Sequence, residues 1–375
     1  MGDPTGHVTG ATAVAGAALI VVFFLTHEAR APLREFFGTW AYGFSDRVRL
    51  VYYDKLARPR KLPGAHTYVF TDLERLTPAG LKWTAELAEM LAARDEAPQI
   101  LNHPRHVLRR YDFQRALYER GVNPFRVHRA LSVPGDVRFP VFLRSEHEHR
   151  VRTPLLRDAQ ELERELDRVR AEGDDLSALL VVEYEDVADD DGLYHRHISH
   201  LVGDAIVPGY VAYSPNWEVK WGPFLDGERL ESQRASVLAH EHDPLFLELA
   251  ELAGVQYGRF DYAIAGGRVI VWELNTNPTM LARPSEHSNW ALDQVLPHTG
   301  RVVAAYEQLA GEPGDGLPPV SFRAPSDQLV VGSPGKEPLR VRVRLAPGIG
   351  PMLWINERRM IRNAVARQSA RAAEV

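Results

Sequence analysis

Polar residues interrupt two apolar stretches within the segment Tyr257–Pro278 (YGRFDYAIAGGRVIVWELNTNP). Asp261 lies inside the first stretch, and Glu273 and Asn275 lie two residues apart at the end of the second. Residues two apart in a strand share a face of the sheet. Carboxylates within a buried strand are costly unless they pair with a cation or bind one. The pattern therefore indicates a cation site built on two strands.

The turn between these strands decides whether the two carboxylates meet. A three-residue loop ending at Arg268 would place Asp261 directly opposite Glu273, and Gly267 could take the left-handed conformation that such loops need. A two-residue turn of Gly266 and Gly267 would instead send Glu273 to the opposite face. We expect the three-residue loop, because the alternative buries two carboxylates on different faces and each would need its own partner.

Two kinds of cation fit this register. Asp261, Glu273 and Asn275 would offer oxygen ligands to Mg²⁺, which prefers a few carboxylates together with phosphate oxygens. Alternatively Arg259, which lies two residues before Asp261 and on the same face, could form a buried ion pair with the carboxylates and leave no metal. The spacing alone leaves both open.

The same segment resembles the closing motif of the ATP-grasp superfamily. The resemblance is carried by Arg259-x-Asp261, the hairpin, Glu273-x-Asn275 and Asn277-Pro278. It implies that Asp261, Glu273 and Asn275 hold Mg²⁺, with Mn²⁺ as an alternative. It also implies a catalytic role for Arg259, which would stabilise the oxyanion of a tetrahedral intermediate.

Upstream segments fall in the order found in that superfamily. Leu101–Pro104, a helix and Gly121–Phe125 resemble the entry into the grasp domain. Phe139–Arg144 resembles the strand that carries a cation to the nucleotide phosphates, and Val181–Glu185 resembles the hinge whose backbone holds adenine. The resemblance covers about residues 100–310 and implies ATP as a substrate. The implied ATP-binding residues are Arg144, Glu183, Tyr184 and Glu185.

Two features depart from the family pattern. Arg144 stands where most members carry Lys, which keeps the charge and favours bidentate oxygen contacts. The loop 145–153 contains no glycine, so the phosphates would be held there by side chains such as His149, Arg150 or Arg152. Lys220 lies between two tryptophans in a chain of 39 Arg and 5 Lys. It is either a phosphate-binding residue or a surface lysine whose stem packs on the aromatic rings.

Other polar clusters have simpler interpretations. His195 and His197 occupy alternate strand positions, where a Zn²⁺ site competes with histidines that line a lid or the surface. The acidic run Asp189–Asp191 could hold a ribose hydroxyl, but we interpret it as a solvated turn. Seven arginines between Arg105 and Arg129 we interpret as a solvated basic face.

Composition excludes several classes of protein. The chain has 375 residues, a net charge of -6 and no cysteine, so disulfides and thiolate chemistry are excluded. General nucleic-acid binders are usually basic, and the apolar stretch from Ala11 to Leu25 is too short to span a membrane. We therefore expect a cytoplasmic protein with small-molecule partners and neither nucleic acid nor membrane; the sequence indicates no oligomeric state.

Strands that alternate with helices predict a parallel sheet at the start of the chain. Buried strands are predicted over Leu19–Leu25, Val48–Tyr53 and His66–Phe70, followed by a helix with Thr77 as N-cap, Pro78 in its first turn and an apolar face of Trp83, Leu87, Met90 and Leu91. Later strands are predicted over Pro140–Arg144, Leu179–Tyr184, Ile198–Val202, Ile206–Val211, Gly258–Ala265 and Val269–Leu274, with helices from Asp112 to Gly121, over Asp158–Ala171 and from Asp243 to Gly254.

These elements and the resemblance predict an α/β and α+β fold. We expect a flexible tail over 1–16, an α/β pre-ATP-grasp domain over 17–104 and an ATP-grasp domain over 105–310. Within the latter, a nucleotide-lid subdomain would cover about 125–185 and a metal-site subdomain about 190–310. Residues 311–375 would form a linker and a weakly patterned basic C-terminal extension.

The resemblance implies an ADP-forming, ATP-dependent ligase. Such an enzyme activates a carboxylate as an acyl phosphate, which an amine, a thiol or another nucleophile then attacks. A kinase of the same fold would stop after phosphoryl transfer, and a nucleotide-binding scaffold would not turn over at all. ADP release with and without acceptors separates the three.

Overall fold

The computed structural model describes residues 21–56, 60–147, 151–219, 227–278, 280, 289–310, 317–322, 360–364 and 366. The predicted tail over 1–16, Lys220, His149 and Arg150 lie outside these residues, as does most of 311–375. None of the described helices is long and apolar enough to cross a membrane.

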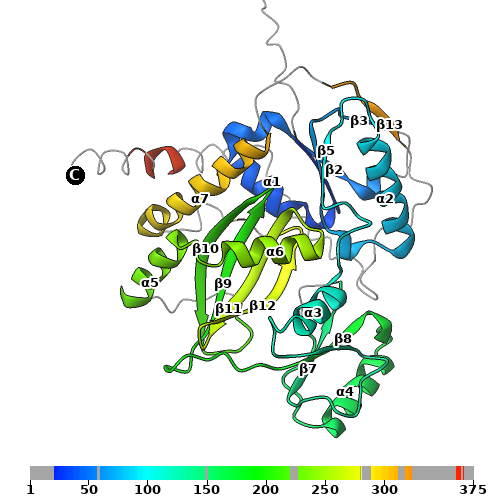
Figure 1. The fold of residues 1–375 in the computed structure, drawn as a ribbon, viewed down its shortest axis with the longest axis vertical. Helices are drawn as coiled ribbons and strands as arrows, with labels where there is room; N and C mark the ends of the chain where they lie inside the picture. Colours follow the sequence, from blue (N-terminus) through cyan, green and yellow to red (C-terminus); the bar gives the residue numbers. More distant parts are fainter. Residues whose placement is uncertain are drawn as a thin grey trace, which may run out of the picture.

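The first unit is a parallel sheet with a helix on each face (Figure 1). Its strand order is β2-β1-β4-β5, and all its pairs are parallel, as predicted. Every residue of the central strand β1 is buried, because α1 and α2 cover it from opposite sides. The elements are β1 (Val21–Leu25), α1 (Ala31–Gly38), β2 (Val48–Tyr52), β4 (Thr67–Phe70), α2 (Pro78–Ala92) and β5 (Gln99–Leu101).

Helix α2 begins as the sequence predicts. The Thr77 side chain accepts a hydrogen bond from the Gly80 backbone N–H, and Pro78 occupies the first helical position. The predicted apolar face is buried except at Met90, which is 38% exposed. Including Met90 in that face was wrong, because the burial follows Leu87 and Leu91 around the helix instead.

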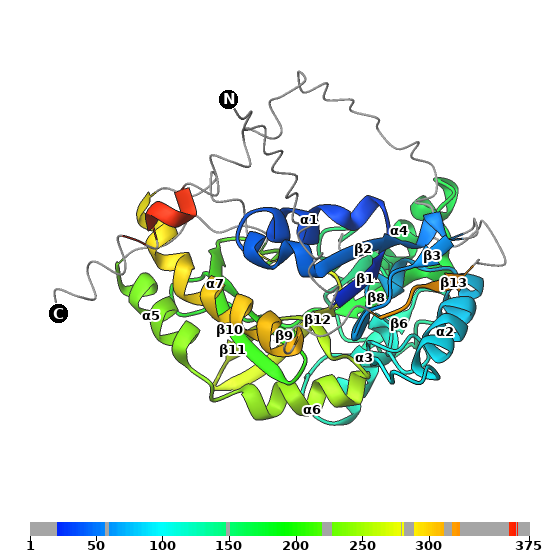
Figure 2. The ribbon, with the colours of Figure 1, turned by 90° about the horizontal axis from the view of Figure 1, so that it is seen from above.

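Two antiparallel sheets follow, and a cleft separates them. The smaller has the order β6-β8-β7 and packs on α4; the larger has the order β10-β9-β11-β12. Helices α3 and α6 cover the face of the larger sheet that carries Phe260 and Val271. Figure 2 shows α7 on the other side of that sheet, next to α1. The elements between the first unit and the larger sheet are α3 (Arg110–Glu119), β6 (Val127–Arg129), β7 (Val141–Ser145), α4 (Ala159–Ala171) and β8 (Leu179–Glu183). The elements of the larger unit are β9 (Tyr194–Val202), β10 (Ala205–Ser214), α5 (Gly227–Leu238), α6 (Asp243–Ala253), β11 (Tyr257–Ala265), β12 (Arg268–Asn275) and α7 (Asn289–Ala310).

This arrangement confirms the predicted fold class, an α/β unit followed by two facing antiparallel subdomains. One helix start was predicted wrongly. Helix α3 begins at Arg110 with Arg109 as its N-cap, and Asp112 lies in the first turn. The aspartate there is still favourable, because a negative charge in the first turn complements the helix dipole.

The hairpin of β11 and β12 differs from the expected one at its tip. Ala265 pairs with Arg268, so the turn has two residues, Gly266 and Gly267, with φ of +57° and +75°. Positive φ at both positions is typical of the tight hairpin turn that matches strand twist. The prediction of a three-residue loop was wrong.

A β-bulge restores the expected pairing lower in the hairpin. Tyr262 pairs with Val271, but Asp261 pairs with Glu273, so Trp272 is the extra residue. A bulge shifts which face the following residues occupy. Glu273 therefore lies directly opposite Asp261, as the sequence predicted, although the extra residue lies in the strand and not in the loop.

The described part of the C-terminal extension returns to the first unit. Strand β13 (Val320–Phe322) pairs antiparallel with β3 (Arg60–Leu62), and Phe322 packs 5.7 Å from Trp83, ring centre to ring centre. Farther on, Ile361 and Ala364 join the core that contains α1 and α7.

Asn102 joins the first unit to the larger sheet. It is fully buried. Its side-chain amide donates to the Tyr257 carbonyl at 2.8 Å, and its Oδ1 accepts from the backbone N–H groups of Gln256 and Tyr257 at 2.8 and 2.9 Å. Its φ is +55°, a left-handed conformation that asparagine tolerates and alanine does not.

We therefore predict that Asn102→Gly lowers the free energy of unfolding by about 2 kcal/mol or more, because three buried backbone groups lose their partner. Asn102→Ala should lose about 1 kcal/mol more, since alanine is strained at positive φ. Urea unfolding followed by tryptophan fluorescence measures both. Equal stability of the two variants would contradict the backbone argument, and a wild-type midpoint for Asn102→Gly would contradict the hydrogen-bond argument.

Candidate functional site

A cavity of about 170 Å³ lies between the two antiparallel sheets. One end is aromatic and the other is charged. The lining residues are Phe142, Arg144, Val151, Val182, Glu183, Tyr184, Glu185, Val187, Tyr194, His195, Arg196, Trp217, Glu218, Val219, Asp261, Trp272 and Glu273. The cavity thus brings together the predicted hinge, the predicted phosphate-binding arginine and both predicted metal-binding carboxylates.

Asp261 forms a bidentate ion pair with Arg259. The Nε–Oδ1 and Nη2–Oδ2 distances are 2.6 and 2.9 Å, and both residues are buried. Arg196 adds a longer contact of 3.5 Å between Nη1 and Oδ2. Burial alone would lower the pKa of Arg259, but the adjacent carboxylate outweighs it and the pKa is raised. Arg259 therefore keeps its positive charge at neutral pH.

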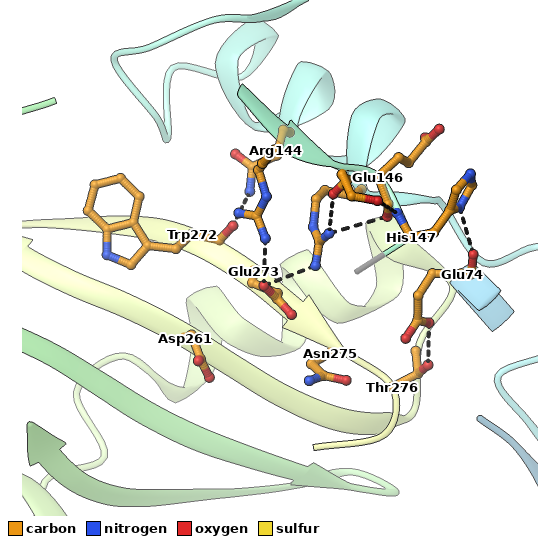
Figure 3. Close-up of polar contacts among 12 residues, drawn as sticks. Glu74, Arg144, Glu146, His147, Asp261, Trp272, Glu273, Asn275 and Thr276 are labelled. Atoms are coloured by element: carbon orange, nitrogen blue, oxygen red, sulfur yellow. Dashed lines mark hydrogen bonds and ion pairs between the residues drawn. The ribbon is translucent and has the colours of Figure 1, made fainter. Parts of the chain in front are cut away.

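Glu273 is held by two guanidinium groups, one from β7 across the cleft and one from the start of α3. Its Oε2 lies 3.1 Å from Arg144 Nη2 and 3.0 Å from Arg110 Nη2. Figure 3 shows Arg144 above Glu273, joined to it by a dashed line. Burial, followed by the charge of Arg110, lowers the pKa of Arg144 to about 10. Arg144 still carries its charge at pH 7. It reaches the carboxylates from β7, as the sequence predicted.

Among the described residues, arginines outnumber the carboxylates that they contact at this end of the cavity. Four arginines, Arg110, Arg144, Arg196 and Arg259, contact two carboxylates, Asp261 and Glu273. These guanidinium groups lie in a partly buried place where charge interactions are stronger than in water. Such an excess favours a polyanionic ligand.

Sequence reasoning missed Arg110. It lay among seven arginines interpreted as a solvated face, but its side chain is 8% exposed. It also donates to the backbone oxygens of Ser145 and Glu146 at 2.9 and 3.2 Å. The sequence offered one indication of this burial: Arg110 lies beside the start of the predicted helix that directly follows the first unit.

The same helix holds the bulge of β12. Gln114 Nε2 donates to the carbonyls of Val271 and Trp272 at 3.2 and 2.8 Å. Asn123, just after the helix, accepts from the Val271 N–H at 2.9 Å and donates to its carbonyl at 2.8 Å. These bonds replace the ladder that the extra residue interrupts.

The glutamates of the predicted hinge already have cationic partners. Both oxygens of the buried Glu183 carboxylate accept hydrogen bonds from Arg126, and Oε1 also accepts from the Arg138 N–H. Glu185 pairs with Arg138 at 2.8 Å. The two glutamate side chains thus fix the loop that carries these arginines. Any contact of Glu183 with a nucleotide base would therefore come from its backbone.

Aromatic rings surround the hinge end of the cavity. Trp217 packs against Phe142 and Tyr184, with ring centres 4.9 and 5.9 Å apart, and the Tyr184 hydroxyl donates to that of Tyr194 at 2.9 Å. On the opposite wall the bulged Trp272 stacks on a buried phenylalanine. This end can enclose a flat, apolar ring.

The oxygen donors at the charged end suit a hard divalent cation. Asp261 and Glu273 are cross-strand neighbours, and Asn275 follows on the same side (Figure 3). Asn275 Oδ1 also accepts from the Asn277 N–H at 2.9 Å. Two carboxylates and an amide match the ligands that Mg²⁺ accepts when phosphate oxygens complete the shell. The guanidinium groups would then share the carboxylates with the ion.

A histidine metal site has no support among the residues that the structure describes, where no three His, Cys, Asp or Glu side chains are grouped for a metal. His195 Nε2 hydrogen-bonds to the Ile264 carbonyl at 2.9 Å. His197 stacks on Tyr262, and burial lowers its pKa to about 3.

The glycine-free loop is described only at its ends. Arg152 forms an ion pair with Asp174, away from the cleft carboxylates. His147 Nδ1 lies 2.8 Å from the Glu74 carbonyl oxygen, in the first unit. The acidic turn 189–191 pairs through Asp191 with Arg229.

No protein-family model matches the chain, and no curated protein matches it significantly. Solved structures with a similar fold are ATP-grasp proteins. One is a RimK-domain ATP-grasp protein from Sphaerobacter thermophilus, at 16% identity and a TM-score of 0.44, covering 77% of this chain and 97% of that chain. Another is the D-alanine–D-alanine ligase from Bacillus anthracis in complex with ATP, at 12% identity and a TM-score of 0.43, covering 76% and 98%. A third is the Helicobacter pylori D-alanine–D-alanine ligase, at 12% and 0.42, covering 77% and 99%. At such identities and TM-scores the likeness does not extend to substrate or reaction.

We predict that Asn123→Ala loosens the bulge. Val271 would lose the partners of its N–H and its carbonyl, at a cost of about 2 kcal/mol. The Val271 amide should exchange with solvent faster, and the midpoint of urea unfolding should fall. Asn216→Ala, an exposed asparagine in the loop after β10, is the matched control. Unchanged exchange at Val271 would show that the bulge holds without this side chain.

Proposed function

We propose that the protein is an ATP-dependent ligase that forms ADP. One observation supports this most directly: a single cavity joins an aromatic pocket at the strand β8 hinge to a carboxylate pair surrounded by four arginines. An adenine ring suits the first end, and the excess positive charge suits a triphosphate at the second. The adenine ring and the triphosphate would thus lie at opposite ends of one cavity.

Each predicted residue has a role in this proposal. The backbone of Glu183–Glu185 would hold adenine, and Arg144 together with Arg110 would hold phosphate oxygens. Lys220, which lies outside the described residues, remains a proposed phosphate-binding residue. Asp261, Glu273 and Asn275 would hold Mg²⁺, or Mn²⁺, which when bound neutralises phosphate charge. Positioning and charge stabilisation of this kind are most of what phosphoryl transfer requires.

Arg259 would act on the second half of the reaction. A substrate carboxylate oxygen forms a bond to the γ-phosphorus while the bond to ADP breaks. A nucleophile then attacks the acyl carbon, and phosphate leaves with the electrons of the C–O bond. Arg259 is fixed by its bidentate pair with Asp261 and would donate to the oxyanion that forms in between.

Two other outcomes fit the same cavity. A kinase would release ADP with one acceptor, and a nucleotide-binding scaffold would release none. The small-molecule carboxylate and nucleophile, the cytoplasmic location and the domain limits at about 17–104, 105–310 and 311–375 also remain proposals. ADP release measured with single acids and with acid–nucleophile pairs separates ligase, kinase and scaffold.

We predict that Glu273→Gln abolishes Mg²⁺-dependent ADP release, by about a hundredfold or more, with the fold intact. The amide keeps the shape but replaces a charged metal ligand with a weaker, neutral one and removes the charge that faces Arg110 and Arg144. Steady-state turnover at saturating ATP measures the loss. Glu251→Gln, an exposed glutamate on α6, is the control. Normal activity of Glu273→Gln would overturn the metal assignment, and unfolding would favour the ion-pair interpretation.

We predict that ATP is preferred over GTP by about tenfold or more in kcat/KM. Backbone groups at residues 183–185 have fixed donors and acceptors, so they would match the edge of adenine and oppose that of guanine. Turnover with both nucleotides measures the ratio. Comparable values would mean that the base is held elsewhere.

A further inference from the structure

A second cavity, of about 110 Å³, lies beside the nucleotide cleft. It is bounded by the first unit, the start of α3 and the end of β12. A single water needs only about 10–15 Å³, so this cavity can hold a small organic molecule. Its floor is apolar and includes Leu81, Val107, Phe113 and Leu274. We name it the acceptor cavity.

Two buried polar atoms on its wall have no hydrogen-bond partner among the described residues. They are Glu74 Oε1 and Arg109 Nε. The other oxygen of Glu74 accepts from Thr276 Oγ1 at 3.2 Å, which fixes the carboxylate (Figure 3). Arg109 Nη2 donates to the main-chain carbonyl of Glu74 at 3.0 Å, so the two residues are neighbours. A buried polar group without a partner is costly and indicates a ligand.

Three other charged groups on the wall, Glu146, Glu273 and Arg110, already have ion-pair partners. Glu146 pairs with Arg129, and Glu273 pairs with Arg110 and Arg144. Glu74 has no ion pair among the described residues. His147, which contacts Arg109, is uncharged at neutral pH because burial, and then the arginine, lower its pKa. Arg109 has no ion pair among the described residues either, so a ligand cation at Glu74 and a ligand oxygen at Arg109 would complete the wall.

The shape of the missing ligand follows from these groups. Glu74 requires a hydrogen-bond donor, best a primary ammonium. Arg109 Nε requires an acceptor oxygen close by. The floor requires an apolar body of a few carbon atoms. These needs describe a compact apolar amine that also carries a carbonyl oxygen.

The acceptor cavity and the nucleotide cleft share a wall. Glu273 lines both cavities, so a ligand in one lies next to the phosphate end of the other. We propose that the acceptor cavity binds the nucleophile of the ligase, an apolar amine with its ammonium at Glu74 and its carbonyl at Arg109. The role of the bound amine as a nucleophile rests on the proposed function, but its binding in this cavity does not.

In that reaction the bound ammonium first releases one proton to water. The free amine nitrogen forms a bond to the acyl carbon, the C–O bond to phosphate breaks, and phosphate takes the electron pair. The nitrogen then loses its second proton, and an amide remains. Glu74 binds the ammonium before this sequence, and Arg109 orients the amine.

Three probes of one shape test the binding. Leucinamide carries ammonium, carbonyl and an isobutyl body; 4-methylpentanamide lacks the ammonium, and isoamylamine lacks the carbonyl. Titration of the full chain by saturation-transfer NMR and calorimetry at pH 7 should give the order leucinamide, then the two truncated probes. Loss of the ammonium should weaken binding about tenfold or more.

Variants locate the binding. Glu74→Gln should weaken leucinamide about tenfold and leave 4-methylpentanamide unchanged, because only the former carries the cation. Leu81→Phe, which fills the floor, should weaken both. Glu86→Gln, an exposed glutamate on α2, is the matched control and should change neither. Circular dichroism confirms that each variant is folded.

The outcomes separate this inference from the proposed function. Equal binding of leucinamide and 4-methylpentanamide, an unchanged affinity in Glu74→Gln, or no binding of any probe would overturn the acceptor cavity, whatever the turnover. Once an acid–amine pair gives ADP release, Glu74→Gln should raise KM for the amine and leave KM for ATP unchanged. Amine binding at Glu74 without any amine-dependent turnover would retain the site and overturn the ligase.

Discussion

The extra residue in strand β12 is the constraint on which the charged end of the cleft depends. With a two-residue turn and no bulge, Glu273 would face α6 and the apolar core under the sheet. The bulge at Trp272 turns Glu273 back toward Asp261 and presents the indole ring to the cleft as well. Hydrogen bonds from Gln114 and Asn123 hold this irregular backbone. The same helix supplies Arg110, so one element both shapes the strand and neutralises the carboxylate that the shape exposes.

The electrostatic design follows from that placement. Each carboxylate of the pair is satisfied by guanidinium groups: Asp261 by Arg259 on its own strand, and Glu273 by Arg144 across the cleft. Without these partners, the buried carboxylates would strongly destabilise the folded protein. Because the arginines outnumber the carboxylates, a polyphosphate can bind without stripping either acid of its partners. The ion-pair and metal interpretations of the sequence are thus compatible. The arginine–carboxylate ion pairs are present, and the carboxylates of Asp261 and Glu273 still lie side by side as oxygen donors.

The sequence predicts the regular parts of this site and misses the irregular ones. The strands, the Thr77 cap and the pairing of Asp261 with Glu273 follow from apolar runs, capping chemistry and the cost of buried charge. The position of the extra residue does not, because the turn glycines allow both loop lengths and the bulge is decided by Gln114 and Asn123, distant in sequence. Arg110 was missed for the same reason: its burial results from packing between units, which local charge patterns do not encode.

The end of β12 is also where the first unit meets the cleft. Asp72, buried after β4, accepts from Thr26 and from the Asn277 amide at 2.9 Å, and burial, then Glu74, raises its pKa to about 6. Two residues on, Glu74 meets Thr276. The residues that follow Asn275 are therefore held by carboxylates of the first unit. Under the proposed function, β12 would contact the nucleotide on one side and the first unit on the other. Whatever binds at Glu74 would then lie at a fixed position relative to the phosphates. The parallel sheet is then part of the site, because its loops supply the wall that the two antiparallel sheets lack.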